Sequence, residues 1–282
     1  MRKRVIILAL LAAILMPAGS ATASPLETLM GLTMGFETTV PIIMYHALDK
    51  SPDNIWEITA QEFEADLEYL SKNGYTTVVM QDLVGFVHHG KPLPEKPIVL
   101  SFDDGRRLDE VLPMLEQYDA RITMAIIGQE TDHYTEIGRG KHPHMTWDEV
   151  KAAADTGRVE IQSHTYGLHG AKGAGKRRGE SNEAYRQRFL ADLHKFADVL
   201  RQNTGIVPNS LAYPLGIISP TSDDIIKEAG YSASLSCQEK NNRLAVGDLD
   251  CLFSLSRFLR PPGKTSDSFF AKLEEGKTAE SQ

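Results

Sequence analysis

The sequence has few cysteines, few aromatic residues and no apolar run long enough for an ordinary membrane span. Two of its 282 residues are cysteine and 7% are aromatic. The longest apolar run, "VIILALLAAILM", falls short of the roughly 20 residues that cross a bilayer as a helix. Internal repeats and long low-complexity segments are also missing. The chain is therefore long enough for one large domain with its own core, or for two small domains.

The N-terminus has the pattern of a secretory signal peptide. A basic start, "MRKR", precedes the apolar run, and the small residues "ATA" precede Ser24, so residues 1–23 are expected to be removed. The alternative is that the segment is kept as an anchor, and only then is a membrane contact expected. Cleavage removes three basic residues and no acidic one, so it leaves 259 residues and changes the net charge from −8 to −11. Such an acidic protein is a poor candidate for binding nucleic acid or an anionic membrane.

Export changes what the two cysteines could do. Cys237 and Cys251 would enter an oxidising compartment, where a disulfide is plausible. Spacing alone does not set disulfide geometry, so two unpaired cysteines are an equal alternative.

Short β-branched runs alternate with helical patterns from residue 40 onward. A capping box at Thr59 and Glu62 opens a helix that ends near Gly74, and Thr146 with Glu149 repeats this device in the segment that ends at Gly157. The segment after Ser181 carries apolar residues at helical spacing. This alternation predicts an α/β fold with a parallel sheet, and eight strands in one domain favour a distorted (β/α) barrel over an open sheet. The predicted strands are 40–46, 75–80, 97–102, 120–127, 158–164, 209–214, 231–236 and 253–259.

The ends of the chain are expected to lie outside the domain. The predicted arrangement is a signal peptide at 1–23, an N-terminal extension at 24–39, one domain at 40–262 and a polar C-terminal tail at 263–282.

Polar residues stand where several predicted strands end. Asp103 and Asp104 follow the strand 97–102, and two adjacent carboxylates repel each other unless each has a partner. In parallel barrels and open sheets alike, functional groups gather at the C-terminal ends of strands. Those ends also carry further candidates: His46, His164, Tyr213 and Arg257.

The spacing of His164 and His169 suggests a turn between them. Five residues turn through about 500° on a helix, and they point to opposite faces on a strand. The two imidazoles can converge only if the chain turns, which Gly167 permits. With Asp104 they would form a three-ligand site with an open position, as in a catalytic zinc site. Asp103 would then be free to act as a general base.

Each of these signals also has an ordinary structural interpretation. A pair of aspartates is commonly a solvated turn or a helix cap, and two histidines five residues apart are commonly incidental. His46 alone would be a structural histidine. The histidines at 88–89 and 142–144 are expected at the surface. A metal site is favoured because the aspartate pair and the histidine pair both stand at strand ends of the same predicted α/β domain.

Three segments, "LSFDDG", "SHTYGLH" and "AYPLG", resemble the successive motifs of the NodB-like polysaccharide deacetylases, carbohydrate esterase family 4. The resemblance implies that Asp103 is the catalytic base and that Asp104, His164 and His169 hold one divalent metal ion. Zinc is expected, and such a set also accepts cobalt or nickel. The resemblance further implies that the backbone N–H of Tyr213 helps to stabilise the oxyanion.

The opening "VPIIMYHAL" and the following "EFEADLEYLSKNGYTTV" resemble the branch with the poly-β-1,6-N-acetylglucosamine deacetylases. That resemblance, which covers residues 40–262, implies that His46 is the general acid. Arg257 is expected beside Tyr213 among the substrate-binding residues. The chain departs from the family pattern in its six-residue second motif, its third motif without arginine, its lack of a "DW" motif, and Arg106 where an aromatic residue is common.

The expected function is that of a secreted, metal-dependent N-deacetylase of an amino-sugar polymer, acting outside the cytoplasm as a monomer. Poly-N-acetylglucosamine, peptidoglycan glycan and chitin-like chains all present the same acetamide. Two alternatives stay open: a non-catalytic carbohydrate-binding barrel, and an O-acetyl esterase with the same metal centre. Sugar binding alone needs neither a base nor an acid, which argues against the first alternative.

Overall fold

The computed structural model describes residues 36–138 and 144–279, and the side chains of these residues except 274–279. The expected signal peptide lies outside the described residues. Among the residues that are described, no helix combines the length and apolar character needed to span a membrane.

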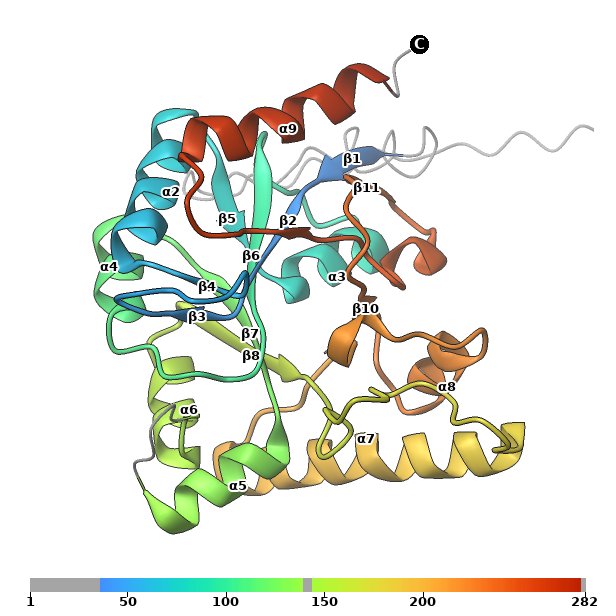
Figure 1. Ribbon diagram of the computed structural model, residues 1–282. Helices are drawn as coiled ribbons and strands as arrows, with labels where there is room; N and C mark the ends of the chain where they lie inside the picture. The colour runs from blue at the N-terminus through green and yellow to red at the C-terminus, as the bar shows by residue number, and fades with distance from the viewer. Residues whose placement is uncertain (1–35, 139–143, 280–282) are drawn as a thin grey trace, which may run out of the picture.

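A parallel sheet of eight strands forms the centre of the molecule (Figure 1). Its order is β10-β9-β8-β7-β6-β2-β12, and β5 pairs with the first half of β6 on the side away from β2. Each of the eight predicted strands contains one strand of this sheet, so that part of the prediction is confirmed. The strands are β2 (Ile42–Tyr45), β5 (Thr76–Val78), β6 (Pro97–Phe102), β7 (Ile122–Ile126), β8 (Val159–Ser163), β9 (Ser210–Ala212), β10 (Ala233–Leu235) and β12 (Phe258–Leu259).

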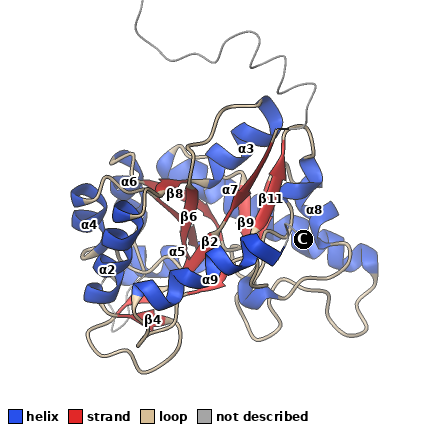
Figure 2. Ribbon diagram, turned by 90° about the horizontal axis from the view of Figure 1, so that it is seen from above, coloured by secondary structure: helices blue, strands red, loops and turns tan. Residues whose placement is uncertain are grey.

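Helices flank the sheet, with α2, α4 and α6 along one side of it (Figure 2). The predicted capping boxes are present: Thr59 with Glu62 begins α2, and Thr146 with Glu149 begins α6. The helices are α2 (Ala60–Lys72), α3 (Met80–His89), α4 (Val111–Gln117), α5 (Gly128–Ile137), α6 (Trp147–Asp155), α7 (Asn182–Thr204), α8 (Ser222–Glu228) and α9 (Ser266–Ala279), with 3-10 turns η1 (Pro214–Gly216) and η2 (Leu249–Leu252).

The sheet is curled into a half-barrel rather than flat, because one segment joins its two edges. Leu255 exchanges backbone hydrogen bonds with β10, donating to Ser234 and accepting from Ser236. A few residues later the same segment becomes β12, which pairs with β2 at the opposite edge. The distorted barrel expected from the strand count is confirmed in this form.

Two short sheets lie beside the main one, and neither was predicted. β1 (Glu37–Val40) pairs antiparallel with β11 (Asn242–Ala245). β3 (Ala47–Leu48) pairs parallel with β4 (Glu57–Ile58) directly after the end of β2.

The C-terminal segment is not the polar tail that was expected from residue 263. Helix α9 begins at Ser266 and buries three apolar side chains in the main core: Phe269, Phe270 and Leu273. A buried ion pair between Arg260 and Asp66 of α2 fixes the approach to this helix, and Ser266 donates to the same carboxylate. The three apolar residues are spaced as on one face of a helix, but the surrounding residues are mostly polar, so the sequence did not predict this helix.

Candidate active site and metal centre

Asp104, His164 and His169 converge at the C-terminal ends of β6 and β8, as their positions in the sequence predicted. One ligand atom of each lies within 4.8 Å of the others. Asp104 Oδ1 lies 3.1 Å from His169 Nε2 and 3.6 Å from His164 Nε2. The same oxygen is buried and accepts no hydrogen bond of good geometry from the described residues. A divalent cation would satisfy this oxygen and both imidazoles, so the donor set fits one.

The backbone conformation of "DDG" directs the two carboxylates apart. Asp104 has φ 72° and Gly105 has φ 78°, in the left-handed region that aspartate tolerates better than most residues and glycine adopts freely. A Cβ on Gly105 would lie 2.9 Å from the side chain of Ile126. The tight turn therefore places Asp104 among the histidines while Asp103 faces the interior.

The tautomer of His164 is set by the neighbouring strand. Its Nδ1–H donates to the carbonyl of Ala212 at the end of β9, 2.8 Å away, which leaves Nε2 directed toward Asp104. Such a contact orients a metal-binding histidine and makes its ring a better ligand. Although burial raises the pKa of Asp104, the two imidazoles outweigh it and hold that pKa below its usual range.

Asp103 is ionised and buried because Arg257 holds both of its oxygens. The Nη1 and Nη2 atoms of Arg257 donate to the carboxylate at 2.7 and 2.9 Å, and the two side chains are 0 and 3% exposed. Burial alone would raise the pKa of Asp103, but the guanidinium outweighs it and lowers the pKa. The two adjacent aspartates are accommodated because each has its own partner. Asp103 is paired with Arg257, and Asp104 lies against His164 and His169.

The sequence placed Arg257 among the substrate-binding residues, but in this structure its guanidinium is held in the interior and is not part of the cavity lining. It precedes β12 rather than ending it, and its Nε donates to the carbonyl of Ser236, which fixes it inside the protein. Its role is to hold Asp103. The family pattern expects an arginine in the third motif, and here Arg257 brings a guanidinium to Asp103 from a distant segment.

The backbone N–H of Tyr213, which was expected to serve the oxyanion, is already engaged in this structure. Its backbone N–H donates to the carbonyl of Leu235 at 3.0 Å as part of the sheet, and its hydroxyl donates to Asp223 at 2.8 Å. Tyr213 is fully buried. The residue of this turn that lines the site is Leu215, which is 54% exposed and has φ 58°.

A cavity of about 410 Å³ opens over these groups. His46, from the end of β2, lines it together with Asp103 and the three candidate metal ligands. His46 Nδ1 is buried without a hydrogen-bond partner among the described residues. Burial lowers the pKa of His46, although both aspartates act in the opposite direction. The sequence placed His46 here correctly.

The sequence did not indicate two further residues at the site. Trp56, from the loop before β4, lines the cavity and packs on His46 with ring centroids 4.8 Å apart. His144 was expected at the surface, but it is 8% exposed and its Nδ1–H donates to the carbonyl of Asp104 at 2.7 Å. Neither has a local sequence signal, since each reaches the site through an irregular segment.

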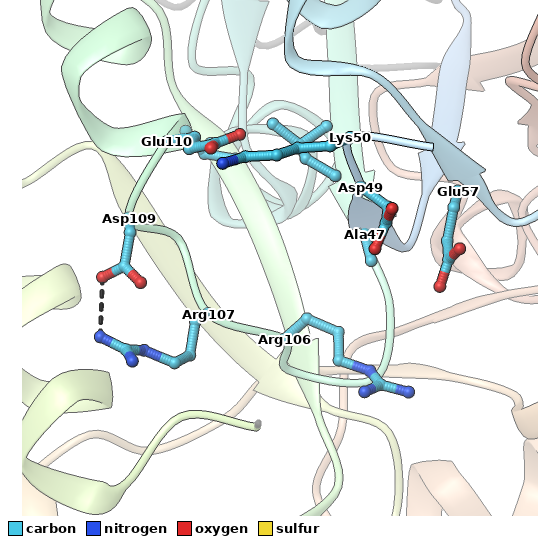
Figure 3. Close-up of a pocket in the computed structure, with 10 residues that line it drawn as sticks. Ala47, Asp49, Lys50, Glu57, Arg106, Arg107, Asp109 and Glu110 are labelled. Carbon is cyan, nitrogen blue, oxygen red and sulfur yellow. Dashed lines mark hydrogen bonds and ion pairs between the residues drawn. The ribbon is translucent and has the colours of Figure 1, made fainter. Parts of the chain in front are cut away.

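Two more cavities adjoin the central one. One, of about 430 Å³, shares Ala47, Glu57 and Arg106 with it (Figure 3). In that view Arg106 and Arg107 extend in opposite directions from the loop after β6, and Arg107 pairs with Asp109. The other, of about 390 Å³, shares Arg106 and two of the candidate metal ligands. Together the two cavities extend the open space beyond the central cavity.

Both cysteines are free. Cys237 lines the central cavity, with its Sγ 3.8 Å from Arg257 Nη2, while Cys251 belongs to η2. Of the two alternatives that the sequence left open, the structure has the unpaired one.

Comparison with known proteins identifies the family. Residues 90–234, more than half of the chain, match the family model described as polysaccharide deacetylase. The chain belongs to the polysaccharide deacetylase family. The match spans the strands that carry Asp103, Asp104, His164 and His169, and the family acts on N-acetylated polysaccharides as a hydrolase of amide bonds.

Individual relatives are similar at modest identity. The chain is 27% identical over 241 residues to the putative polysaccharide deacetylase YxkH of Bacillus subtilis, covering 84% of this chain and 77% of that protein. It is 26% identical over 219 residues to the poly-beta-1,6-N-acetyl-D-glucosamine N-deacetylase of Escherichia coli K12, covering 68% of this chain but 33% of that protein. The fold matches a de-N-acetylase from Aggregatibacter actinomycetemcomitans with a TM-score of 0.69 and 23% identity. The match covers 84% of this chain and 99% of that chain.

Proposed function

We propose that this polysaccharide deacetylase is an extracytoplasmic, metal-dependent N-deacetylase that hydrolyses acetamide groups of an amino-sugar polymer. The observation that carries the proposal is the convergence of three metal-ligand side chains beside a buried, ionised Asp103 in one cavity. The signal-like first 23 residues support action outside the cytoplasm.

Asp104, His164 and His169 would hold the metal ion. A carboxylate with two imidazoles and an open position suits zinc, and it also accepts cobalt or nickel. When bound there, such an ion polarises a carbonyl and lowers the pKa of water. The orphaned Oδ1 of Asp104 and the oriented ring of His164 are the features of this chain that support the assignment.

Asp103 would act as the general base and His46 as the general acid. Arg257 keeps Asp103 ionised, so the carboxylate is ready to accept a proton from the attacking water. A lowered pKa makes protonated His46 a stronger acid toward the leaving amine, although it reduces the fraction that is protonated at neutral pH. The unpartnered Nδ1 leaves the ring free of competing bonds from the described residues.

Leu215 is the residue that we propose as the backbone donor to the oxyanion. In the turn 213–217, the N–H of Tyr213 donates to Leu235, and those of Gly216 and Ile217 donate within the turn. Pro214 has no N–H. None of these bonds uses the N–H of Leu215, and Leu215 lines the cavity. Its N–H is therefore the one that this turn can offer to the oxyanion.

Acetate release from a panel of polymers, with and without a chelator, tests the proposal. We expect release from at least one of poly-β-1,6-N-acetylglucosamine, peptidoglycan glycan and chitin oligosaccharides, loss on chelation, and recovery with zinc, cobalt or nickel. An enzyme that releases acetate only from O-acetylated polymers is an esterase, and one that binds a polymer but releases none is a sugar-binding protein; either result refutes the proposal.

A further inference from the structure

Trp56 is a large apolar side chain that remains 45% exposed while lining the catalytic cavity. An indole normally gains free energy by leaving water, so an exposed one beside catalytic groups marks a surface that a ligand would cover. Leu215, 54% exposed, lines the same cavity. The cavity thus offers apolar surface as well as the charged centre.

The position of Trp56 is built into the fold. Strands β3 and β4 are parallel, with Ala47 opposite Glu57, so the residues one step earlier, His46 and Trp56, come side by side. Their rings are 4.8 Å apart at 57°. The side chain of Asn54 accepts the backbone N–H of Trp56 at 2.8 Å, which fixes the turn that leads into β4.

We propose that Trp56 is the platform on which a pyranose ring of the polymer packs, and that it thereby selects sugar chains over small acetylated compounds. This inference rests on the proposed function. The C–H faces of a pyranose are apolar whereas its edges carry hydroxyls, and an indole offers a large, rigid surface to such a face at little cost in conformational entropy. Because Trp56 also touches His46, a ring packed on it is held beside the group proposed to protonate its amine.

Kinetics on two substrates test the platform. For Trp56→Ala, we expect the KM for a β-1,6-linked N-acetylglucosamine oligosaccharide to rise by about 2- to 10-fold. The kcat/KM for p-nitrophenyl acetate, which has no sugar ring, should fall less, so that the ratio of the two specificity constants drops. Trp56→Phe should restore most of the ratio. Ile55→Ala is the matched control, since Ile55 is a 53% exposed neighbour that does not line the cavity, and it should leave both constants unchanged.

Equal losses on both substrates, with no rescue by phenylalanine, would mean that Trp56 only supports His46, and the proposal would be wrong. The same follows if the oligosaccharide KM does not change. These outcomes differ from a failure of the proposed function, in which the wild-type protein itself releases no acetate from the oligosaccharide.

Binding is tested separately by fluorescence. The chain has two tryptophans, and Trp147 is 5% exposed in the core, so Trp147→Phe leaves Trp56 as the reporter. We expect titration with the oligosaccharide to shift or quench the emission of this variant, even if no acetate is released. Saturating binding, detected by calorimetry, without an emission change would overturn the proposal, and so would an absence of binding.

Discussion

Replacing Asp103 by asparagine should cost stability as well as activity, because the carboxylate is the sole acidic partner that the described residues give Arg257. Both of its oxygens accept from the guanidinium, and neither side chain is more than 3% exposed. An amide accepts with one atom only and turns its NH₂ toward a buried cation. Removing one partner of such a pair costs about 3–5 kcal/mol. That is a large part of the free energy of unfolding of a typical domain, about 5–15 kcal/mol.

Urea denaturation, followed by far-UV circular dichroism, measures the loss of stability, and acetate release measures the loss of catalysis. We expect Asp103→Asn to lower the free energy of unfolding by about 3–5 kcal/mol and acetate release by about 10²- to 10⁴-fold. Metal content should stay near that of wild type. The matched control is Asp109→Asn, in the same loop, because its carboxylate is 67% exposed and a pair with such an exposed partner is worth about 0–1 kcal/mol.

A double variant separates the pair from the individual residues. Asp103→Leu with Arg257→Met removes both charges, so the protein should regain stability relative to either single change while staying inactive. Unchanged stability of Asp103→Asn, or single-variant losses that simply add, would refute the account of a coupled buried pair. A loss of metal from Asp103→Asn would instead make Asp103 a ligand.

Three further predictions follow from other parts of the chain. His169→Ala should bind less metal than wild type in elemental analysis, because it removes one of three ligands; equal content would disprove the assignment. Titration of the denatured, non-reduced protein should find two free thiols, Cys237 and Cys251, and none if they are bonded. Hydrogen bonds from Arg188 lower the pKa of Glu180 to about 2, so the stability they add is present above pH 4.5 and is lost as the pH falls toward 2. The difference in unfolding free energy between wild type and Glu180→Gln should narrow over that range, and a constant difference would contradict the shift.

The eight strands of the main sheet and the caps of α2 and α6 could be predicted from the sequence because their signals are local. A β-branched run between helical stretches specifies a buried parallel strand, and Thr59 with Glu62 satisfies the first turn of α2 using neighbouring residues alone. The candidate metal ligands Asp104 and His164 were predictable for a related reason. Parallel strands bring their C-terminal ends together, so residues that follow those strands meet without further information.

The partners of Asp103 and of the Tyr213 N–H depended on contacts that no local pattern encodes. Arg257 meets Asp103 from 154 positions away because it lies in the segment that joins the two edges of the sheet, between the contact of Leu255 with β10 and the pairing of β12 with β2. Likewise, the N–H of Tyr213 is consumed by the register of β9 with β10, which a motif cannot show.

Sequence alone therefore determined which residues stand at the ends of the strands, since strand and helix patterns are set by neighbours in the chain. Tertiary structure alone decided which of those residues face the cavity and which are tied to one another. Trp56 and Arg257 illustrate the difference. Trp56 lies at the cavity because the short strands β3 and β4 pair, and Arg257 lies in the interior because it pairs with the buried carboxylate of Asp103. Both outcomes depend on register and burial, which arise only when distant segments pack together.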